Sequence, residues 1–423
     1  MHVKRWLLLL LAGTSIVGLG VAYLLRDIYV SWTFPPVFYY LTLQFIPRAL
    51  RGLLFGLLGF GAIAVAIYQL NHSLLSAFVR PGQEDVAETV YRHWQRDRGP
   101  KIVAIGGGTG LSALLRGLKE HTSNITAIVT VADDGGSSGR LRQQLGVLPP
   151  GDFRNCIAAL ADAESLTTQL FQYRFSEGEG LNGHSFGNLF IVAMAGVTGN
   201  FERALLESSK VLAVRGQILP STLENVTLVA ELRDEGALGA SDGPQWVEGE
   251  SHIPESGGRI ERVFLQPDAV PAYPGAVRAI LDADLIVAGP GSLYTSILPN
   301  LLVQDIVRAA QASRAKKVYV CNVATQPGET EGYTLGDHMA ALHRHIGPNL
   351  FANVLANDTF TYTLPNLRGV AWVTPDHPAD ASYQVFTADV VDKDYPWRHD
   401  PAKLATWLMS FCENPKGAHN QSS

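Results

Sequence analysis

The sequence predicts an α/β protein with a mostly parallel sheet, and two stretches carry this prediction. Residues 102–105 form a short apolar run rich in β-branched residues, which the glycine-rich turn 106–110 follows at once. Residues 283–287 form a second such run, which leads into the turn 288–292. In both places helical spacing follows the turn, and buried strand, glycine turn and helix in that order are typical of parallel α/β sheets.

The first turn predicts an anion-binding site. Leu111, Leu114 and Leu115 open a helix over 110–120, so the turn places backbone N–H groups at a helix N-terminus, where positive partial charge favours a phosphate. A GxGxxG motif would need glycine where Leu111 stands, and no GK[ST] ending is present. The turn therefore indicates a nucleotide-like ligand but does not identify it. The missing third glycine disfavours NAD-dependent redox chemistry. The alternative to a binding site is a glycine turn that serves only tight packing.

Composition and charge narrow the class of protein. The 423 residues allow two or three domains, and 47% hydrophobic with 17% charged residues describe a chain that can bury a core. A net charge of −6 without a basic stripe excludes a nucleic-acid binder. The three cysteines, Cys156, Cys321 and Cys412, form no CxxC motif, which is typical of a reducing compartment.

Residues 1–75 predict a two-helix membrane anchor. Trp6–Leu25 and Leu53–Leu70 are apolar runs of about membrane-spanning length. A signal peptide is the alternative for the first run, but the small residues near Gly18 continue directly into apolar sequence. The flanking basic residues favour both termini in the cytoplasm, and residues 76–99 are expected to form a polar linker.

Asp133 and Asp134 follow the predicted strand 125–131 in an acidic, glycine-rich loop. Ligand sites of open α/β sheets lie at the carboxyl ends of strands, and two carboxylates there can bind Mg²⁺ or ribose hydroxyls. The alternative is an Asp-Gly loop whose side chains cap their own backbone.

Two loop-to-helix junctions add further candidates. Arg154 and Asn155 open an alanine-rich helix, where the arginine could hold a phosphate in bidentate fashion. His184 and Asn188 flank Ser185 before an apolar helix over 189–196, which favours a role in the site over a structural one. No aspartate partner or GxSxG elbow accompanies this serine, so hydrolase chemistry is not expected.

The second strand–turn–helix unit contains Gly289, Gly291 and Ser292 and predicts a second anion-binding N-terminus. Two such ends on one sheet suit a diphosphate ligand. The next strand, 316–321, ends in polar residues that could recognise a base or sugar or could only build a turn; they include Asn322, Thr325 and Gln326.

The remaining segments complete a domain over 100–410. Residues 220–270 predict a β excursion, strands are expected over 351–355 and 383–390, and a helix over 401–409. Asp337 and His338 lie on a predicted helix, 335–346, and are expected on a solvated face. The polar tail, 411–423, is expected to be disordered.

Six stretches together resemble one family. They read GGGTGLSALLRGLK, TVADDGGSSGRLR, PPGDFRN, GHSFGNL, GPGSLYTSILPNLLV and CNVATQPGET. The set is similar to the CofD-like superfamily, and specifically to its YvcK-type gluconeogenesis-factor branch, over residues 100–400. The resemblance implies a Rossmann-like three-layer α/β/α domain.

The resemblance also implies two functions. The YvcK-type branch binds UDP-sugars such as UDP-N-acetylglucosamine and is linked to carbon metabolism, cell shape and wall synthesis. The enzyme branch, 2-phospho-L-lactate transferase, moves a phospho-linked group from a guanylylated donor with Mg²⁺. Branch-specific motifs, the absence of a clear nucleophile–base pair and the membrane anchor favour the binding protein.

Carried onto this chain, the resemblance places phosphate-facing groups at Gly107, Gly108, Thr109, Gly110, Gly291 and Ser292. Asp133 and Asp134 match the acidic loop, with Asp134 as the candidate Mg²⁺ ligand and both as catalytic only in an enzyme. We expect no tightly bound organic cofactor. The expected partners are a nucleotide diphosphate ligand, a second copy of the chain and an envelope-synthesis protein, at the inner face of a bacterial inner membrane.

Overall fold

The structure is a computed structural model that describes residues 3–31, 35–76, 96–162, 165–233, 245–376 and 382–413. The chain divides into two compact units, Met1–Thr89 and Val90–Ser423. Each unit is described by itself. The predicted linker falls largely on residues 77–95, which lie outside the described residues.

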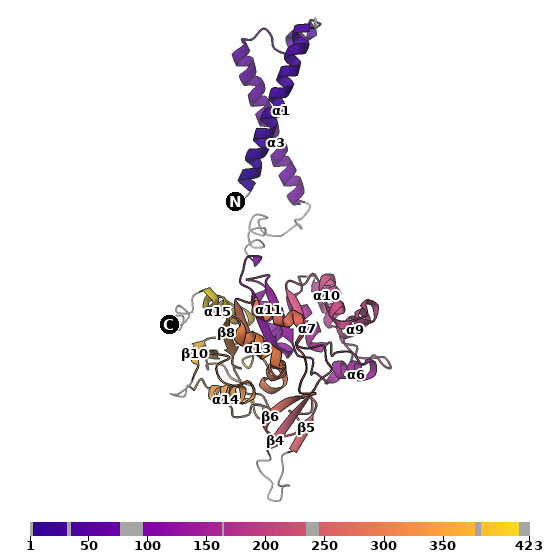
Figure 1. Cartoon of the computed structure of the whole chain (residues 1–423), viewed down its shortest axis with the longest axis vertical. Helices are drawn as coiled ribbons and strands as arrows, with labels where there is room; N and C mark the ends of the chain where they lie inside the picture. Colours follow the sequence, from indigo (N-terminus) through magenta and orange to yellow (C-terminus); the bar gives the residue numbers. More distant parts are fainter. Residues whose placement is uncertain are drawn as a thin grey trace, which may run out of the picture. The chain divides into compact units, whose positions relative to one another are not determined.

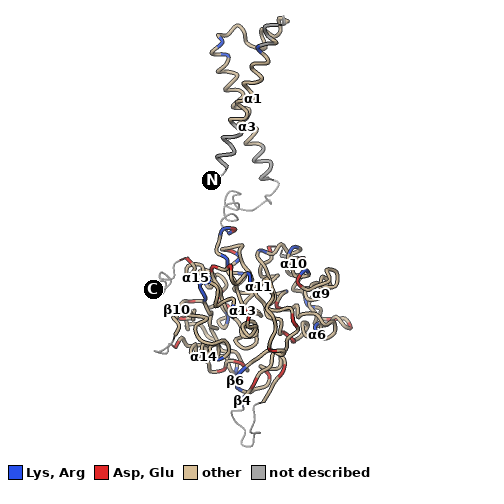
Figure 2. The backbone as a smooth tube through the Cα atoms, in the orientation of Figure 1, with Lys and Arg blue, Asp and Glu red and all other residues tan. Residues whose placement is uncertain are grey.

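The first unit is helical (Figure 1). Its helices are α1, Val3–Ser31, α2, Val37–Leu41, and α3, Arg48–Ser76. Figure 2 shows few charged positions along the described parts of α1 and α3, as the apolar runs in the sequence predict. Within the described residues, Arg48–Gln69 is the one helical segment long and apolar enough to cross a membrane, and its most apolar part is not buried at all.

The prediction of two spans is therefore met for one segment only. The described apolar part of α1, Ala12–Arg26, is shorter than a span. The structure thus supports at most one exposed apolar helix of spanning length and does not establish a multi-pass anchor.

The second unit is built on a seven-stranded parallel sheet in the order β10-β9-β8-β7-β1-β2-β3. β1 lies inside the sheet and pairs in parallel with β2 and β7, so the predicted α/β class with a parallel sheet is confirmed. The strands are β1 Ile102–Gly106, β2 Ile125–Val129, β3 Gln217–Pro220, β7 Leu285–Ala288, β8 Lys316–Val320, β9 Asn353–Asn357 and β10 Gln384–Ala388.

Helices cover both faces of this sheet because the chain leaves its centre in two opposite directions. Right-handed crossovers then place the helices of the two halves on opposite faces. α5 packs against α7 and α15, whereas α11 packs against α13. The helices are α5 Gly108–Leu118, α6 Gly136–Leu145, α7 Gly151–Leu160, α8 Ser165–Gln172, α9 Phe186–Thr198, α10 Phe201–Val211, α11 Pro274–Leu281, η1 Leu293–Ile297, α12 Leu298–Leu301, α13 Gln304–Ala312, α14 Leu335–Ile346 and α15 Pro401–Glu413.

The β excursion forms a separate antiparallel sheet in the order β5-β4-β6. Its strands are β4 Thr227–Arg233, β5 Gln245–Glu248 and β6 Arg259–Gln266. The sequence did not indicate β3, which joins the edge of the large sheet beside β2. Only Ile218 and Leu219 are apolar before Pro220, and this run is too short to predict a strand.

Two sequence expectations are wrong. His338 is fully buried rather than solvated, because α14 turns it inward and its Nδ1 lies 2.8 Å from the Thr334 carbonyl oxygen. Asp337 instead closes a capping box with Thr334 at the start of the helix.

The expected disordered tail begins later than predicted. Residues 411–413 are helical, since α15 continues to Glu413, and Trp407 and Phe411 of this helix stack in the core. Residues 414–423 lie outside the described residues.

Candidate functional site

The two glycine turns meet at one edge of the sheet. Because β1 pairs in parallel with β7, the turns that follow these strands emerge side by side. A Cβ on Gly110 would lie 2.4 Å from the Pro290 carbonyl oxygen and 3.0 Å from the Gly291 Cα. Gly108 and Gly291 both line one cavity of about 840 Å³.

The first turn offers an open amide end. Gly108 has a φ of 62°, which favours glycine, and α5 begins there. The first N–H groups of a helix have no partner within it, so those of Thr109 and Gly110 are available to a ligand in the cavity that these residues line. The Gly108 N–H is different, because it faces the Asp152 carboxylate and lowers its pKa. Burial outweighs that effect and raises the pKa of Asp152 to about 6.

The second turn is not the open anion cradle that the sequence predicted. The Gly291 N–H donates to Asn322 Oδ1 at 3.2 Å, and Asn322 Nδ2 donates to the Gly291 carbonyl oxygen at 3.0 Å. The N–H groups of Tyr294 and Thr295 face the buried Glu329 carboxylate and lower its pKa. This helix start therefore already faces the protein's own amide and carboxylate.

A neutral polar network replaces the second cradle. Gln326 Nε2 donates to Ser292 Oγ at 2.7 Å, and Asn322 Nδ2 lies 3.2 Å from Gln326 Oε1. Thr325 also lines the cavity, but its hydroxyl holds the neighbouring segment through Gly369 and Ala371. The sequence left open whether these residues recognise a ligand or only build a turn. Asn322 and Gln326 line the cavity with their side-chain network, whereas the Thr325 hydroxyl holds the cavity wall together.

Four arginines line the same cavity, and the sequence indicated only Arg154. Burial lowers the pKa of Arg154, and the charge of Arg174 adds to this. Burial likewise lowers the pKa of Arg116, with Arg398 as the second cause. Arg154 and Arg174 are thus neighbouring cations, and so are Arg116 and Arg398. Both pairs line the cavity that the N-terminus of α5 also lines. Asn155 lies here as well and accepts from Arg154 Nη2 at 2.7 Å.

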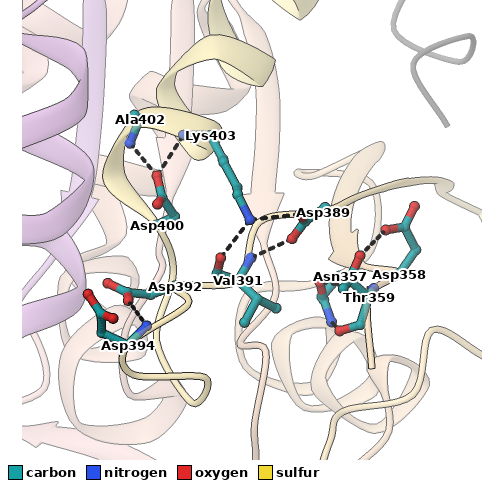
Figure 3. Close-up of polar contacts among 10 residues, drawn as sticks. All are labelled: Asn357, Asp358, Thr359, Asp389, Val391, Asp392, Asp394, Asp400, Ala402 and Lys403. Atoms are coloured by element: carbon teal, nitrogen blue, oxygen red, sulfur yellow. Dashed lines mark hydrogen bonds and ion pairs between the residues drawn. The ribbon is translucent and has the colours of Figure 1, made fainter. Parts of the chain in front are cut away.

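Arg398 lies in the segment between β10 and α15. Hydrogen bonds of residues on both sides of it hold this segment in place (Figure 3). Lys403 Nζ donates to Asp389 Oδ2 at 2.7 Å and to the Val391 carbonyl oxygen at 2.9 Å. Asp400 Oδ1 accepts from the N–H groups of the first turn of α15. The sequence showed no regular pattern here, so only the aromatic and basic run around Arg398 could have drawn attention to it.

Two aromatic side chains flank this arginine. The guanidinium of Arg398 lies 5.4 Å from the centre of the Tyr395 ring and 6.0 Å from that of Trp397. All three residues line the cavity and are exposed. A cation beside two exposed aromatic rings suits stacking against a planar base and contact with an anion.

Asp133 and Asp134 do not line the cavity. Asp133 Oδ1 accepts from the Gly135 N–H at 2.9 Å, as the capping alternative predicts. Asp134 Oδ1 accepts from the Ser251 N–H at 2.9 Å and so holds the loop between β5 and β6. No group of three metal-ligating side chains occurs among the described residues.

His184 and Asn188 hold Ser137, which follows the acidic loop in the first turn of α6. Ser137 Oγ lies 3.0 Å from His184 Nδ1 and accepts from Asn188 Nδ2 at 3.1 Å. Both residues are buried and neither lines the cavity. Burial lowers the pKa of His184, with Arg140 and Arg174 as further causes. Gly289 is buried outside the cavity lining as well.

A further carboxylate, Glu250, lies near this acidic loop and was not indicated by the sequence. It belongs to the loop that Asp134 holds. Burial raises the pKa of Glu250 to about 8, and the charges of Asp133, Asp152, Glu329 and Asp134 add to this. Glu250 therefore lies among four like charges.

We expect Glu250→Gln to stabilise the Val90–Ser423 unit at alkaline pH. Because folding raises the pKa of Glu250 from 4.5 to about 8, the folded state holds this proton more tightly, and stability is lost as the pH rises through that window. The variant should gain on the order of 2 kcal/mol in unfolding free energy at pH 8.5 and almost nothing at pH 4.5. Denaturant unfolding at both pH values measures this.

The exposed Glu255 on the same loop offers the matched control, since Glu255→Gln should leave the unfolding free energy unchanged at both pH values. An equal effect of Glu250→Gln at pH 4.5 and pH 8.5 would contradict the burial of a charge at this position.

Comparison with known proteins gives the family. Residues 102–401 match the family described as 2-phospho-L-lactate transferase CofD. The chain is 46% identical to a putative gluconeogenesis factor from Nostoc, over 99% of this chain and 92% of the relative. It is 49% identical to the gluconeogenesis factor of Bacillus subtilis, over 74% of this chain and 98% of the relative.

A solved structure agrees with this. The crystal structure of a UPF0052-family protein from Bacillus halodurans matches with a TM-score of 0.67 and 42% identity, over 74% of this chain and 99% of that one. The fold, the motifs and the sequence relatives thus coincide over the same part of the chain. The chain belongs to the CofD family and is a homologue of the gluconeogenesis factors.

Proposed function

We propose that the protein binds a UDP-sugar of the UDP-N-acetylglucosamine type and regulates envelope synthesis and cell shape in response to carbon supply. The observation that carries this proposal is the cavity of about 840 Å³, in which the N-terminus of α5 and four arginines converge. Ligand cavities of about 300–1,000 Å³ hold molecules of this size. The family resemblance supplies the identity of the nucleotide sugar.

The charges of the cavity suit a diphosphate. The N–H groups at the start of α5 and the guanidinium groups of Arg116 on α5 and Arg154 on α7 supply hydrogen-bond donors and positive charge to the cavity. Tyr395 and Trp397 offer rings on which a uracil base can stack. The Asn322–Gln326 network offers neutral hydrogen-bonding groups.

A second candidate function is transfer of a phospho-linked group. The observation that favours it is Asp152, whose pKa burial raises to about 6 directly beside the Gly107 turn, where a general base would be useful. Mg²⁺ would then have to arrive with the ligand phosphates, because Asp134 is engaged by Ser251. We rank this second, since Asp133, Asp134 and Asp152 all lie outside the cavity lining.

Calorimetry with UDP-N-acetylglucosamine, GTP and NAD, each with and without Mg²⁺, separates the two candidates. We expect binding of the UDP-sugar without turnover. Arg154→Ala should weaken that binding roughly 10- to 100-fold, because it removes charge-assisted hydrogen bonds to phosphate. Arg308→Ala, which removes an exposed arginine of α13, is the matched control and should bind normally. Consumption of a guanylylated donor with an acceptor would favour the transferase instead.

We further propose that the first unit anchors the protein in the bacterial inner membrane, with α3 and α1 as two passes and the second unit in the cytoplasm. Arg48–Gln69 has the length and composition of a span, and the Nostoc relative aligns over 99% of this chain, which includes this unit. Cysteine labelling at the α2 segment tests the topology. Labelling from outside intact cells supports two passes, and labelling only after lysis contradicts them.

A further inference from the structure

Glu329 is a buried carboxylate between two cavities. Its exposed fraction is 8%, and it lines both the large cavity and a second one of about 230 Å³. The second cavity also contains Arg259, Tyr333 and Asp337 in its lining. A carboxylate so deeply buried needs hydrogen-bond partners for both oxygens.

The loop that carries Glu329 is rigid. The N–H groups of Glu329 and Thr330 both donate to the Gln326 carbonyl oxygen, and the Gln326 N–H donates to Thr330 Oγ1 at 3.0 Å. Gly328 has a φ of 75°, and a Cβ there would lie 2.0 Å from the Pro254 carbonyl oxygen. Backbone and neighbouring loop therefore fix where the carboxylate lies.

One of its two oxygens is satisfied and the other is not. Oε1 accepts from the Thr295 hydroxyl at 3.0 Å. Oε2 is buried and has no hydrogen-bond partner among the described residues. The groups that face the carboxylate are the Thr295 and Ser292 hydroxyls, the N–H groups of Tyr294 and Thr295, and the like charge of Glu250. Burial raises the pKa of Glu329 to about 7.

The neighbours of Glu329 indicate what is missing. The side chains next to it in the cavity wall, Ser292, Gln326 and Asn322, are neutral and already form one connected network. The arginines that suit a diphosphate come from other elements, namely Arg116 on α5 and Arg154 on α7. The part of a ligand that reaches Glu329 is therefore the part beyond the phosphates, and it must bring a hydrogen-bond donor.

We propose that Glu329 selects the sugar of the nucleotide sugar, by accepting a hydrogen bond at Oε2 from a sugar hydroxyl or amide N–H. This inference rests on the proposed function and goes beyond it, because it assigns the sugar to the wall that follows β7 and β8. A site built to hydrogen-bond a ligand donor discriminates strongly against the analogue that lacks it.

The affinities of the full-length protein for UDP-N-acetylglucosamine and for UDP test this, each compared between the native chain and Glu329→Gln. We expect the native chain to prefer the sugar nucleotide, and Glu329→Gln to reduce that preference by roughly 10-fold or more while UDP binds as before. In the native chain the preference should also grow as the pH rises through about 7, since the ionised carboxylate is the better acceptor, and this dependence should vanish in Glu329→Gln.

Glu331→Gln is the matched control. Glu331 lies on the same loop and its Oε1 accepts from the Gly328 N–H, a bond that a glutamine oxygen can also accept. This variant should keep both the preference and its pH dependence. Thermal unfolding of both variants checks that they fold.

Three outcomes would overturn the proposal. An unchanged preference in Glu329→Gln places the sugar elsewhere. Equal losses for UDP and the sugar nucleotide, together with loss of any Mg²⁺ dependence, assign Glu329 to a cation instead. Failure of the native chain to bind either nucleotide removes the proposed function itself, and this inference with it.

Discussion

We expect Gly110→Val to abolish binding of UDP-N-acetylglucosamine, with a loss of more than about 100-fold in affinity. Even a Cβ at this position would lie 2.4 Å from the Pro290 carbonyl oxygen, 2.8 Å from its carbon and 3.0 Å from the Gly291 Cα. Backbone cannot yield as the end of a flexible side chain can, so the two glycine turns must separate. The start of α5 then leaves the position from which its N–H groups face the cavity. Calorimetry on the purified variant measures the loss.

Gly196 provides the control for this substitution. It lies on α9, and a Cβ there would meet nothing within 4 Å. Gly196→Val should bind the nucleotide sugar as the native chain does. Native affinity in Gly110→Val would show that the contact between the turns does not position the ligand.

We expect Gly117→Ala to lower the unfolding free energy of the Val90–Ser423 unit by about 3 kcal/mol and also to weaken binding of the nucleotide sugar. The added Cβ would lie 1.9 Å from the Pro401 carbonyl oxygen and 2.9 Å from Ala405 Cβ, where α15 packs on α5. Pro401 and Arg398 line the same cavity, so a shift of α15 moves its wall. Chemical denaturation and calorimetry on one preparation measure both effects.

The same substitution at Gly196 separates packing from helix propensity. Gly196→Ala should raise stability slightly, because alanine favours a helix over glycine and no neighbour obstructs it. A stable Gly117→Ala variant that binds weakly would still support the role of α15 in the cavity wall. A stable variant with native affinity would contradict it.

Much of the sheet could be predicted from the sequence. Ile102–Ile105 and Val318–Val320 are apolar runs that contain β-branched residues and are followed by turn residues, and each lies in a parallel strand in the structure. The strand Gln217–Pro220 was not predicted because only Ile218 and Leu219 are apolar before Pro220, and its place depends on pairing with β2. Local signals predicted the strands, but strand neighbours depend on the whole chain.

The candidate site could be predicted only in part. Glycine turns are visible in sequence because their spacing is local, and Gly108 and Gly291 indeed line one cavity. Whether a helix start is open or occupied depends on distant residues. Glu329 reaches the second turn from a loop after β8, and no spacing rule connects the two. For the same reason the sequence could not predict that Arg398, almost three hundred residues from the first turn, lines the same cavity.

The acidic residues illustrate the converse case. Asp133 and Asp134 stand at a strand end, where function is usual, yet their oxygens hold Gly135 and Ser251. Asp152, which the sequence analysis did not single out, lies against the Gly107 turn, where a Cβ would meet its Oδ2 at 2.5 Å. Sequence position alone could not show which backbone groups each of these carboxylates holds.

The proposed binding of a nucleotide sugar depends on one arrangement. The open N-terminus of α5 and the arginines hold the diphosphate, while the second turn contributes only neutral and carboxylate groups. A crystal structure of the Val90–Ser423 unit with UDP-N-acetylglucosamine tests this most directly. We predict phosphate oxygens within hydrogen-bond distance of the Thr109 and Gly110 N–H groups, with Arg154 or Arg116 on the opposite oxygens. A ligand bound elsewhere, or phosphates against the N–H groups of Tyr294 and Thr295 with Glu329 displaced, would contradict it.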